Sequence, residues 1–290
     1  MIRKNTETDV TMENIKPINI NERISRQVPL VAYTLLILLP LTLVFFASFK
    51  TLKQLYNDPL GIPEKWSILN YIRLFANENM LIYFKNSFFV TFTSVFFILL
   101  LGSMISYAII RMPNVVGNIL FGFVTLGMMV PTQVKMIPTY VLLSDLNLLN
   151  KHSGLILVTI ATLIPICVFI LTGFMKTLPK GLLEAAMIDG ASHWQVYSKI
   201  VIPLSLPAIA STAIFSFVIT WNDLLHPLLF IKSSSLKTLP LALLQFQGEY
   251  LTDYPMIFAG VVAASIPMII IYIFFQRWFI QGMTAGSMKG

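Results

Sequence analysis

The chain has 290 residues, of which 56% are hydrophobic and only 11% carry a charge. A soluble domain has about 25% charged residues, so this composition excludes a soluble enzyme, a disordered regulator and a disulfide-stabilised secreted domain. The net charge of +7 fits Lys and Arg flanking membrane spans better than a nucleic-acid surface, so we expect no nucleic-acid partner. The single cysteine, Cys167, lies in an apolar run, which predicts a small buried side chain.

Six windows free of Asp, Glu, Lys and Arg are long enough to cross a membrane as helices. About 20 residues span a hydrocarbon core roughly 30 Å thick, and a helix satisfies its own backbone polar groups in lipid. The windows are 29–49, 86–110, 115–134, 154–175, 204–222 and 256–276. The sequence therefore predicts an all-α integral membrane protein, with a polar tail over 1–28 and a six-span transmembrane domain over 29–290.

Both termini are predicted to lie in the cytoplasm, and the chain to be a multi-pass protein of the cytoplasmic (inner) membrane. The first 28 residues are polar and mixed in charge, so we do not expect a cleavable signal peptide. Six spans place both ends on one side of the membrane. That side has slightly more Lys and Arg, as cytoplasmic loops do.

Small residues four positions apart mark places where helices approach closely in lipid. Gly102 and Ser106 have this spacing in the second window, and Ala259 and Ala263 have it in the sixth. Such pairs form packing seams within one chain or against a partner, and the spacing allows both.

The loop 176–203, between the fourth and fifth windows, is predicted to contain two short helices. Pro179 suits the first turn of a helix, good helix formers follow it, and Gly190 suits the left-handed residue that closes a helix. Ser192 and Gln195 have the spacing of a capping box, which predicts the start of the second helix. Pro203 disfavours helical geometry at the preceding residue and predicts the turn into the fifth span there.

The loop resembles the EAA loop of ABC-importer permeases. Glu184-Ala185-Ala186, three residues, Gly190, nine residues, and then Ile200 with Pro203 reproduce the spacing of that motif. Ile202 is a mild departure, because the motif favours Leu there. Further segments resemble carbohydrate-uptake permeases of the maltose and glycerol-phosphate type, in particular the shorter six-span subunit. They are Tyr107-Ala108 with Arg111, Ile137-Pro138 with Tyr140, Trp221-Asn222-Asp223, 238–241, 245–250 and 276–290.

This resemblance implies the type I ABC-importer permease fold and a set of partners. These are a second homologous permease, two cytoplasmic ABC ATPases that use ATP-Mg, and an extracytoplasmic solute-binding protein. The implied function is to translocate a sugar or sugar derivative across the membrane. The loop would hold a coupling helix that docks in an ATPase groove. The implied ATPase-coupling residues are Glu184, Ala185, Ala186, Asp189, Gly190, Ile200 and Pro203.

No catalytic or nucleotide-binding motif is present in the sequence. There is no G-x-x-x-x-G-K-[ST] phosphate cradle, and the three histidines lack the spacing of metal ligands. We therefore expect a chain that is not an enzyme and binds no cofactor or metal itself.

Polar residues at the ends of the third and fifth windows are candidates for the solute path. Gln133, Asn222 and Asp223 lie there, and ionisable groups at membrane depth are candidates for function. Solvation at the membrane interface explains them equally well. The scarcity of charges in the spans suits a neutral, hydroxyl-rich solute better than an ion-coupled one.

Three other functions are compatible with six spans. An ABC permease for a non-sugar solute would share the loop. A self-contained secondary carrier would need acidic or histidine relays within the spans, which the windows lack. A membrane scaffold would leave the spacing of the loop without a purpose. An ATPase that copurifies with the chain would support an ABC permease and would argue against both the secondary carrier and the scaffold.

Overall fold

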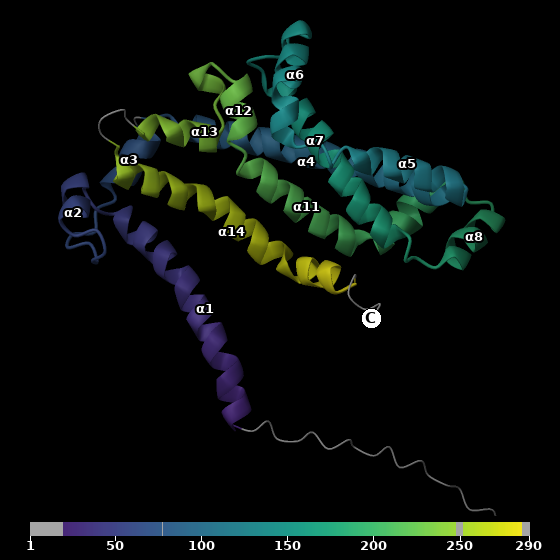
Figure 1. Ribbon diagram of the computed structural model, residues 1–290, viewed down its shortest axis with the longest axis horizontal. Coiled ribbons are helices and arrows are strands. Elements are labelled where there is room, and N and C mark those ends of the chain that lie inside the picture. The colour runs from purple at the N-terminus through teal and green to yellow at the C-terminus, as the bar shows by residue number, and fades with distance from the viewer. Residues whose placement is uncertain (1–19, 77, 248–251, 286–290) are drawn as a thin grey trace, which may run out of the picture.

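The computed structural model describes residues 20–76, 78–247 and 252–285, and the regular structure in these residues is helical (Figure 1). The helices are α1 (Ile20–Ala47), α2 (Leu52–Asn57), α3 (Leu69–Ala76), α4 (Met80–Arg111), α5 (Asn114–Leu126), α6 (Thr132–Asp145), α7 (His152–Met175), α8 (Lys180–Ile188), α9 (His193–Val196), α10 (Ile202–Leu204), α11 (Leu206–Trp221), α12 (Leu225–Phe230), α13 (Leu239–Leu243) and α14 (Tyr254–Ala285). A π-helical turn, Tyr197–Val201, joins α9 to α10.

Within the described residues, four helices are long and apolar enough to cross a membrane: Gln27–Ala47, Met80–Arg111, His152–Met175 and Tyr254–Arg277. The bent pair His193–Leu204 and Leu206–Trp221 makes a fifth when it is counted as one span. These helices cover the first, second, fourth, fifth and sixth predicted windows. The predicted all-α membrane fold is therefore confirmed, whereas the count of six spans stays a prediction.

The third window, 115–134, is not one helix, and this part of the prediction is wrong. α5 ends at Leu126 and α6 begins at Thr132. Between them the amides of Gly127, Met128 and Met129 each donate to a carbonyl three residues earlier, which tightens the chain into turns. Pro131 has no amide hydrogen with which to continue a helix. Gln133 therefore lies in the first turn of α6, not at the end of a span.

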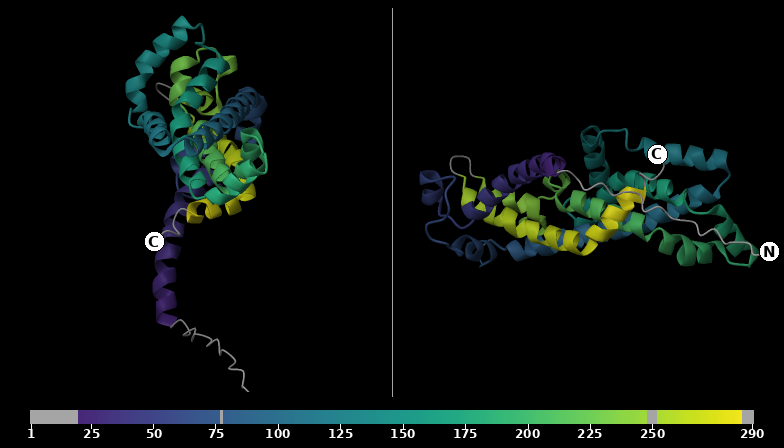
Figure 2. Two further views of the ribbon diagram at one scale, coloured as in Figure 1. Left: turned by 90° about the vertical axis from the view of Figure 1, so that its right-hand side faces the viewer. Right: turned by 90° about the horizontal axis from the view of Figure 1, so that it is seen from below.

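The first helix starts earlier than the window that predicted it. α1 begins at Ile20, so the part of the predicted tail that the structure describes is already helical; residues 1–19 lie outside the described part. Only 6% of the span Gln27–Ala47 is buried, and α1 diverges from the other long helices (Figure 1 and left panel of Figure 2). Two of the segments that resemble carbohydrate-uptake permeases, 245–250 and 276–290, are described only in part, because 248–250 and 286–290 lie outside the described residues.

The core of the bundle is the contact between α4 and α7. Gly102 faces Cys167, and a side chain at position 102 would overlap the Cys167 sulfur. Ser106 Oγ donates to the carbonyl of Val168 at 3.4 Å. The seam predicted at Gly102 and Ser106 thus packs within the chain, and Cys167 is fully buried as predicted.

We expect Gly102→Ala to destabilise the α4–α7 contact, because overpacking a tight core costs about 1–3 kcal/mol. Adding Cys167→Ala should restore most of the loss by removing the sulfur. The measurement is the thermal unfolding midpoint of the purified protein in detergent. Gly122→Ala on α5 is the matched control, because no atom lies within 4 Å of a Cβ built there. Equal midpoints for the Gly102 and Gly122 variants would contradict this packing.

The loop 231–239, called here the anchored loop, is tied to the start of α4 and α7 by polar side chains. Asn86 Nδ2 donates to the carbonyls of Ser235 and Lys237 at 2.8 and 2.9 Å. Asn150 Oδ1 accepts from the amides of Lys232 and Ser233, each at 2.9 Å. His152 Nε2 lies 2.9 Å from the Leu236 carbonyl oxygen, and the Leu239 amide donates to Ser87 Oγ at 2.7 Å. The loop therefore has a fixed position at one end of the bundle.

Candidate functional site

Helix α8 is held by one face and exposed on the other. Leu183 is buried, and Ala186 and Met187 pack against the main core. The opposite face is exposed and consists of Leu182, Glu184, Ala185 and Ile188, the last of them 85% exposed. α8 lies at the opposite end of the molecule from α2 and α3 (Figure 1). A short helix fixed in this way presents an apolar surface with one carboxylate.

Gly190 ends α8 in the predicted left-handed conformation, with φ of +85°. Its amide donates to the Met187 carbonyl at 3.1 Å, and the Ala191 amide donates to the Ala186 carbonyl at 3.0 Å. These two bonds form a Schellman motif, which satisfies carbonyls that the helix end leaves free. A Cβ built at Gly190 meets no atom within 4 Å. The requirement for glycine thus comes from the backbone and not from crowding.

The second half of the loop starts as predicted and ends differently. Ser192 and Gln195 form the expected capping box. The helix does not stop before Pro203, however, because Ile202 is helical and its amide donates to the carbonyl of Tyr197, five residues earlier. In a regular α-helix a proline ring clashes with the carbonyl four residues back, and this π-helical turn widens the backbone directly before Pro203. The prediction of a turn at Ile202 is therefore wrong.

The turn into the fifth span lies at Ser205. The helix His193–Leu204 and the helix Leu206–Trp221 meet there at 75°. Pro207 has no amide hydrogen for the Pro203 carbonyl, which accounts for the break at this place. Ser205 is fully buried, and its hydroxyl has no hydrogen-bond partner in the part of the chain that the structure describes. The loop and α11 are consequently two stiff segments joined at one residue.

Tyr197 holds this second segment against α4. Its hydroxyl lies 2.8 Å from Ser103 Oγ, and its ring lies 5.4 Å from that of Tyr107. The ring of Trp194 lies 5.3 Å from that of Tyr197 at a tilt of 37°, and Trp194 remains 61% exposed. The aromatic contacts fix α9 to the bundle while leaving Trp194 exposed.

Most of the predicted coupling residues are exposed. Glu184, Ala185, Asp189, Gly190 and Pro203 are exposed, whereas Ala186 and Ile200 are half-buried and pack inward. The exposed members offer a place for another protein. The two half-buried members support the loop.

The predicted path residues Gln133, Asn222 and Asp223 have different surroundings. Gln133 is exposed on α6. Asn222 lines a cavity of about 260 Å³ between α11 and α14. Asp223 instead caps α12: its Oδ1 accepts from the amides of Leu225 and His226, and its Oδ2 lies 2.7 Å from Nδ1 of the His226 ring.

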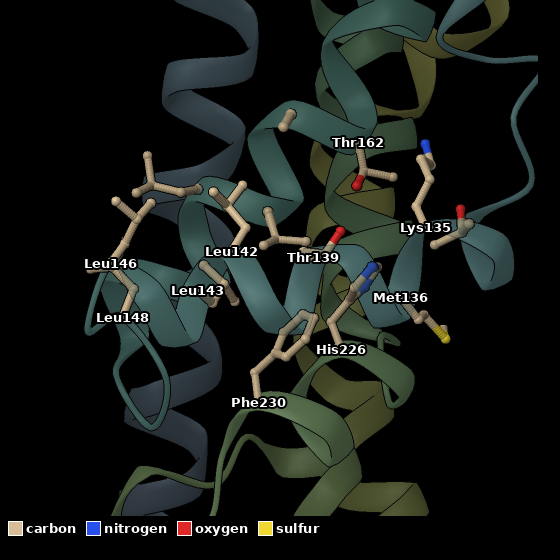
Figure 3. Close-up of a pocket in the computed structure, with 14 residues that line it drawn as sticks. Lys135, Met136, Thr139, Leu142, Leu143, Leu146, Leu148, Thr162, His226 and Phe230 are labelled. Carbon is tan, nitrogen blue, oxygen red and sulfur yellow. The ribbon is translucent and has the colours of Figure 1, made fainter.

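A larger cavity of about 420 Å³ lies between α6, α7 and α12 (Figure 3). Its polar lining residues are Thr132, Lys135, Thr139, Thr162 and His226. Sequence reasoning did not select Thr139, Thr162 or His226, since single threonines and one histidine are unremarkable in a membrane chain. The sequence offered one signal for His226: it follows Asp223 by three residues, which is the spacing of a residue that caps a helix and a residue in its first turn. Within the described residues, no group of three or more His, Cys, Asp or Glu side chains is arranged so that it could hold a metal ion.

Comparison with known proteins identifies the family. A family model described as "Binding-protein-dependent transport system inner membrane component" matches residues 98–285. The chain therefore belongs to this family of ABC-importer permeases, the non-catalytic membrane subunits of such importers.

Sequence relatives and a solved structure agree with this assignment. The "Multiple sugar-binding transport system permease protein MsmG" of Streptococcus mutans is 38% identical over 259 residues, covering 88% of this chain and 93% of the relative. The "Arabinooligosaccharides transport system permease protein AraQ" of Bacillus subtilis is 34% identical over 263 residues, covering 89% and 92%. A chain of a bacterial ABC transporter that imports alginate has the same fold, with a TM-score of 0.73, 21% identity, and coverage of 91% and 99%.

Proposed function

We propose that this chain is the permease subunit of an ATP-driven importer for a sugar or sugar derivative. The observation that carries the proposal is the exposed face of α8 with its Schellman turn at Gly190, at one end of the bundle. It has the residue spacing of a coupling loop in a chain of the permease family. The sugar class rests on the relatives, whose names refer to sugar-transport systems.

In this proposal the energy comes from partner subunits. Two ABC ATPases bind and hydrolyse ATP-Mg, and this chain binds no cofactor itself. α8 sits in an ATPase groove, Glu184 makes a charged contact there, and Gly190 sets the angle between α8 and α9. Movement of the ATPases then reaches α11 through the joint at Ser205.

The remaining partners complete the transport path. A second, homologous permease pairs with this chain, and an extracytoplasmic binding protein delivers the solute. Both termini and the coupling loop 176–203 lie in the cytoplasm in this arrangement, and the anchored loop lies outside. Gln133, Asn222 and Asp223 are proposed to act along the solute path, Asp223 through its contact with His226.

Reconstitution tests the proposed function. We expect this chain alone in liposomes neither to hydrolyse ATP nor to move sugar. With the second permease, the ATPases and a sugar-loaded binding protein, it should hydrolyse ATP and accumulate sugar in the vesicle. Solute flux through the chain alone would support a secondary carrier instead. Activity of the full complex with amino acids but not with sugars would support a non-sugar importer.

A further inference from the structure

The cavity between α6, α7 and α12 has a polar end and an apolar end. Figure 3 shows Lys135, Thr139, Thr162 and His226 gathered at one end of it. Leucines of α6 and of the loop after it occupy the other end. Neither threonine hydroxyl has a hydrogen-bond partner among the described residues, so both are available to a ligand.

The polar end lies deep in the span of α7. His152, the first residue of α7, contacts the anchored loop and marks one end of the bundle. Thr162 follows ten residues later, which corresponds to about 15 Å at 1.5 Å per residue, or about half of a hydrocarbon core roughly 30 Å thick. The leucines lie nearer the anchored loop, because Leu148 precedes α7 and Leu157 is on its second turn.

This order of polarity does not suit a lipid. A lipid places its polar head at the membrane surface and its chains toward the middle, whereas this cavity has its polar groups toward the middle. Polar and ionisable groups at membrane depth that line a cavity are typical of a solute path.

The charges around the polar end favour an anion. Lys135 is the only Lys, Arg, Asp or Glu that lines the cavity, and it has no ion pair or hydrogen bond within the described residues. The carboxylate of Asp223 is already occupied by His226 and by the first amides of α12. Lys135 is half-buried, and an ammonium that is withdrawn from water is costly without a counter-charge, so a bound anion would supply the negative charge that Lys135 lacks.

We propose that this end of the cavity is a subsite for an acidic sugar unit, one that carries a carboxylate. Lys135 pairs with the carboxylate, and Thr139, Thr162 and His226 hydrogen-bond the ring hydroxyls. Asp223 is a positioning residue, since it accepts from Nδ1 of His226 and thereby orients the imidazole. The proposal rests on the proposed importer function and narrows its solute class, in contrast to the neutral solute that the sequence favours.

Cysteine labelling tests the subsite without a transport assay. Thr139→Cys and Thr162→Cys are made separately in a Cys167→Ser background, in the assembled importer in nanodiscs. Each thiol reacts with a negatively charged (sulfonatoethyl) or a positively charged (trimethylammonioethyl) methanethiosulfonate. We expect Lys135→Met to lower the anionic-to-cationic rate ratio about tenfold, because a nearby unit charge acts at low effective dielectric constant. Lys135→Arg should keep the ratio. Millimolar galacturonate should slow labelling, and galactose should not.

Ser234→Cys in the anchored loop is the matched control, because Ser234 is exposed and does not line the cavity. Lys135→Met should therefore leave the anionic-to-cationic rate ratio at this cysteine unchanged. The proposal is overturned by an unchanged ratio at both cavity cysteines, by equal protection from galactose and galacturonate, or by cysteines that do not react in an assembled complex. Failure of the importer function has a separate signature, namely ATP hydrolysis that no binding protein stimulates.

Discussion

Replacing Gly190 by Val is expected to lower sugar uptake about tenfold or more while the protein still inserts in the membrane. Gly190 has φ of +85°, and a left-handed backbone costs roughly 1–2 kcal/mol for a residue with a Cβ. A β-branched residue is worse, and about 1.4 kcal/mol corresponds to a factor of ten. Valine would therefore release the Schellman turn and change the angle between α8 and α9. Uptake into cells and the amount of permease in the membrane fraction are the two measurements.

Two variants serve as controls for Gly190→Val. Gly190→Asn should keep most of the uptake, because asparagine tolerates this conformation; the chain itself has Asn79, Asn147 and Asn150 at φ between 53° and 56°. Gly173→Val, on α7, should be nearly silent, since this exposed glycine has no positive φ and no atom lies within 4 Å of a Cβ built there. Normal uptake by Gly190→Val would show that the α8–α9 turn does not couple the ATPase to the spans.

Reversing the charge of Glu184 is expected to weaken ATPase binding more than tenfold. Glu184 is exposed and lies beside the apolar Ile188 on the outward face of α8, so lysine there should not disturb the fold of the subunit. Placing the wrong charge in a charged interface contact costs about 2–5 kcal/mol. The measurement is the amount of ATPase that copurifies with the permease at low and at physiological salt.

Ser234→Lys is the control for the charge reversal. Ser234 is also exposed, but it lies in the anchored loop between α12 and α13, two helices that lie away from α8 in Figure 1. It should leave ATPase binding unchanged. If Glu184→Lys also retains the ATPase fully, then the exposed face of α8 is not the docking surface.

Hydropathy located the spans well where one helix carries the whole window, as in α4 and α7. It failed at 115–134, because the absence of charge does not distinguish one helix from a helix followed by turns at Gly127 and Pro131. It also cannot see structure in polar loops. Between α1 and α4, Lys50 is almost fully buried and donates to the Asp58 carbonyl, and α2 and α3 are folded around it.

The coupling loop was more predictable than the cavity, for a physical reason. Gly190, Ser192 and Gln195 act on backbone atoms a few residues away, so their spacing along the chain already determines the geometry. The turn predicted at Ile202, before Pro203, is wrong because the π-helical turn there depends on how Tyr197 packs on α4. The cavity joins Lys135, Thr162 and His226, which are far apart in the chain, and only the packing of α6, α7 and α12 brings them together.

The anchored loop also decides which parts of the molecule can move together. It follows α12 in the chain and leads through α13 toward α14, yet its hydrogen bonds go to Asn86, Asn150 and His152, at the start of α4 and α7. Segments joined by such hydrogen bonds move together even when they are far apart in the chain. The outer ends of α4 and α7 therefore carry this loop with them as one block. Any relative rotation of α11 has to be absorbed on the other side of the loop, in the short segment between Trp221 and α12.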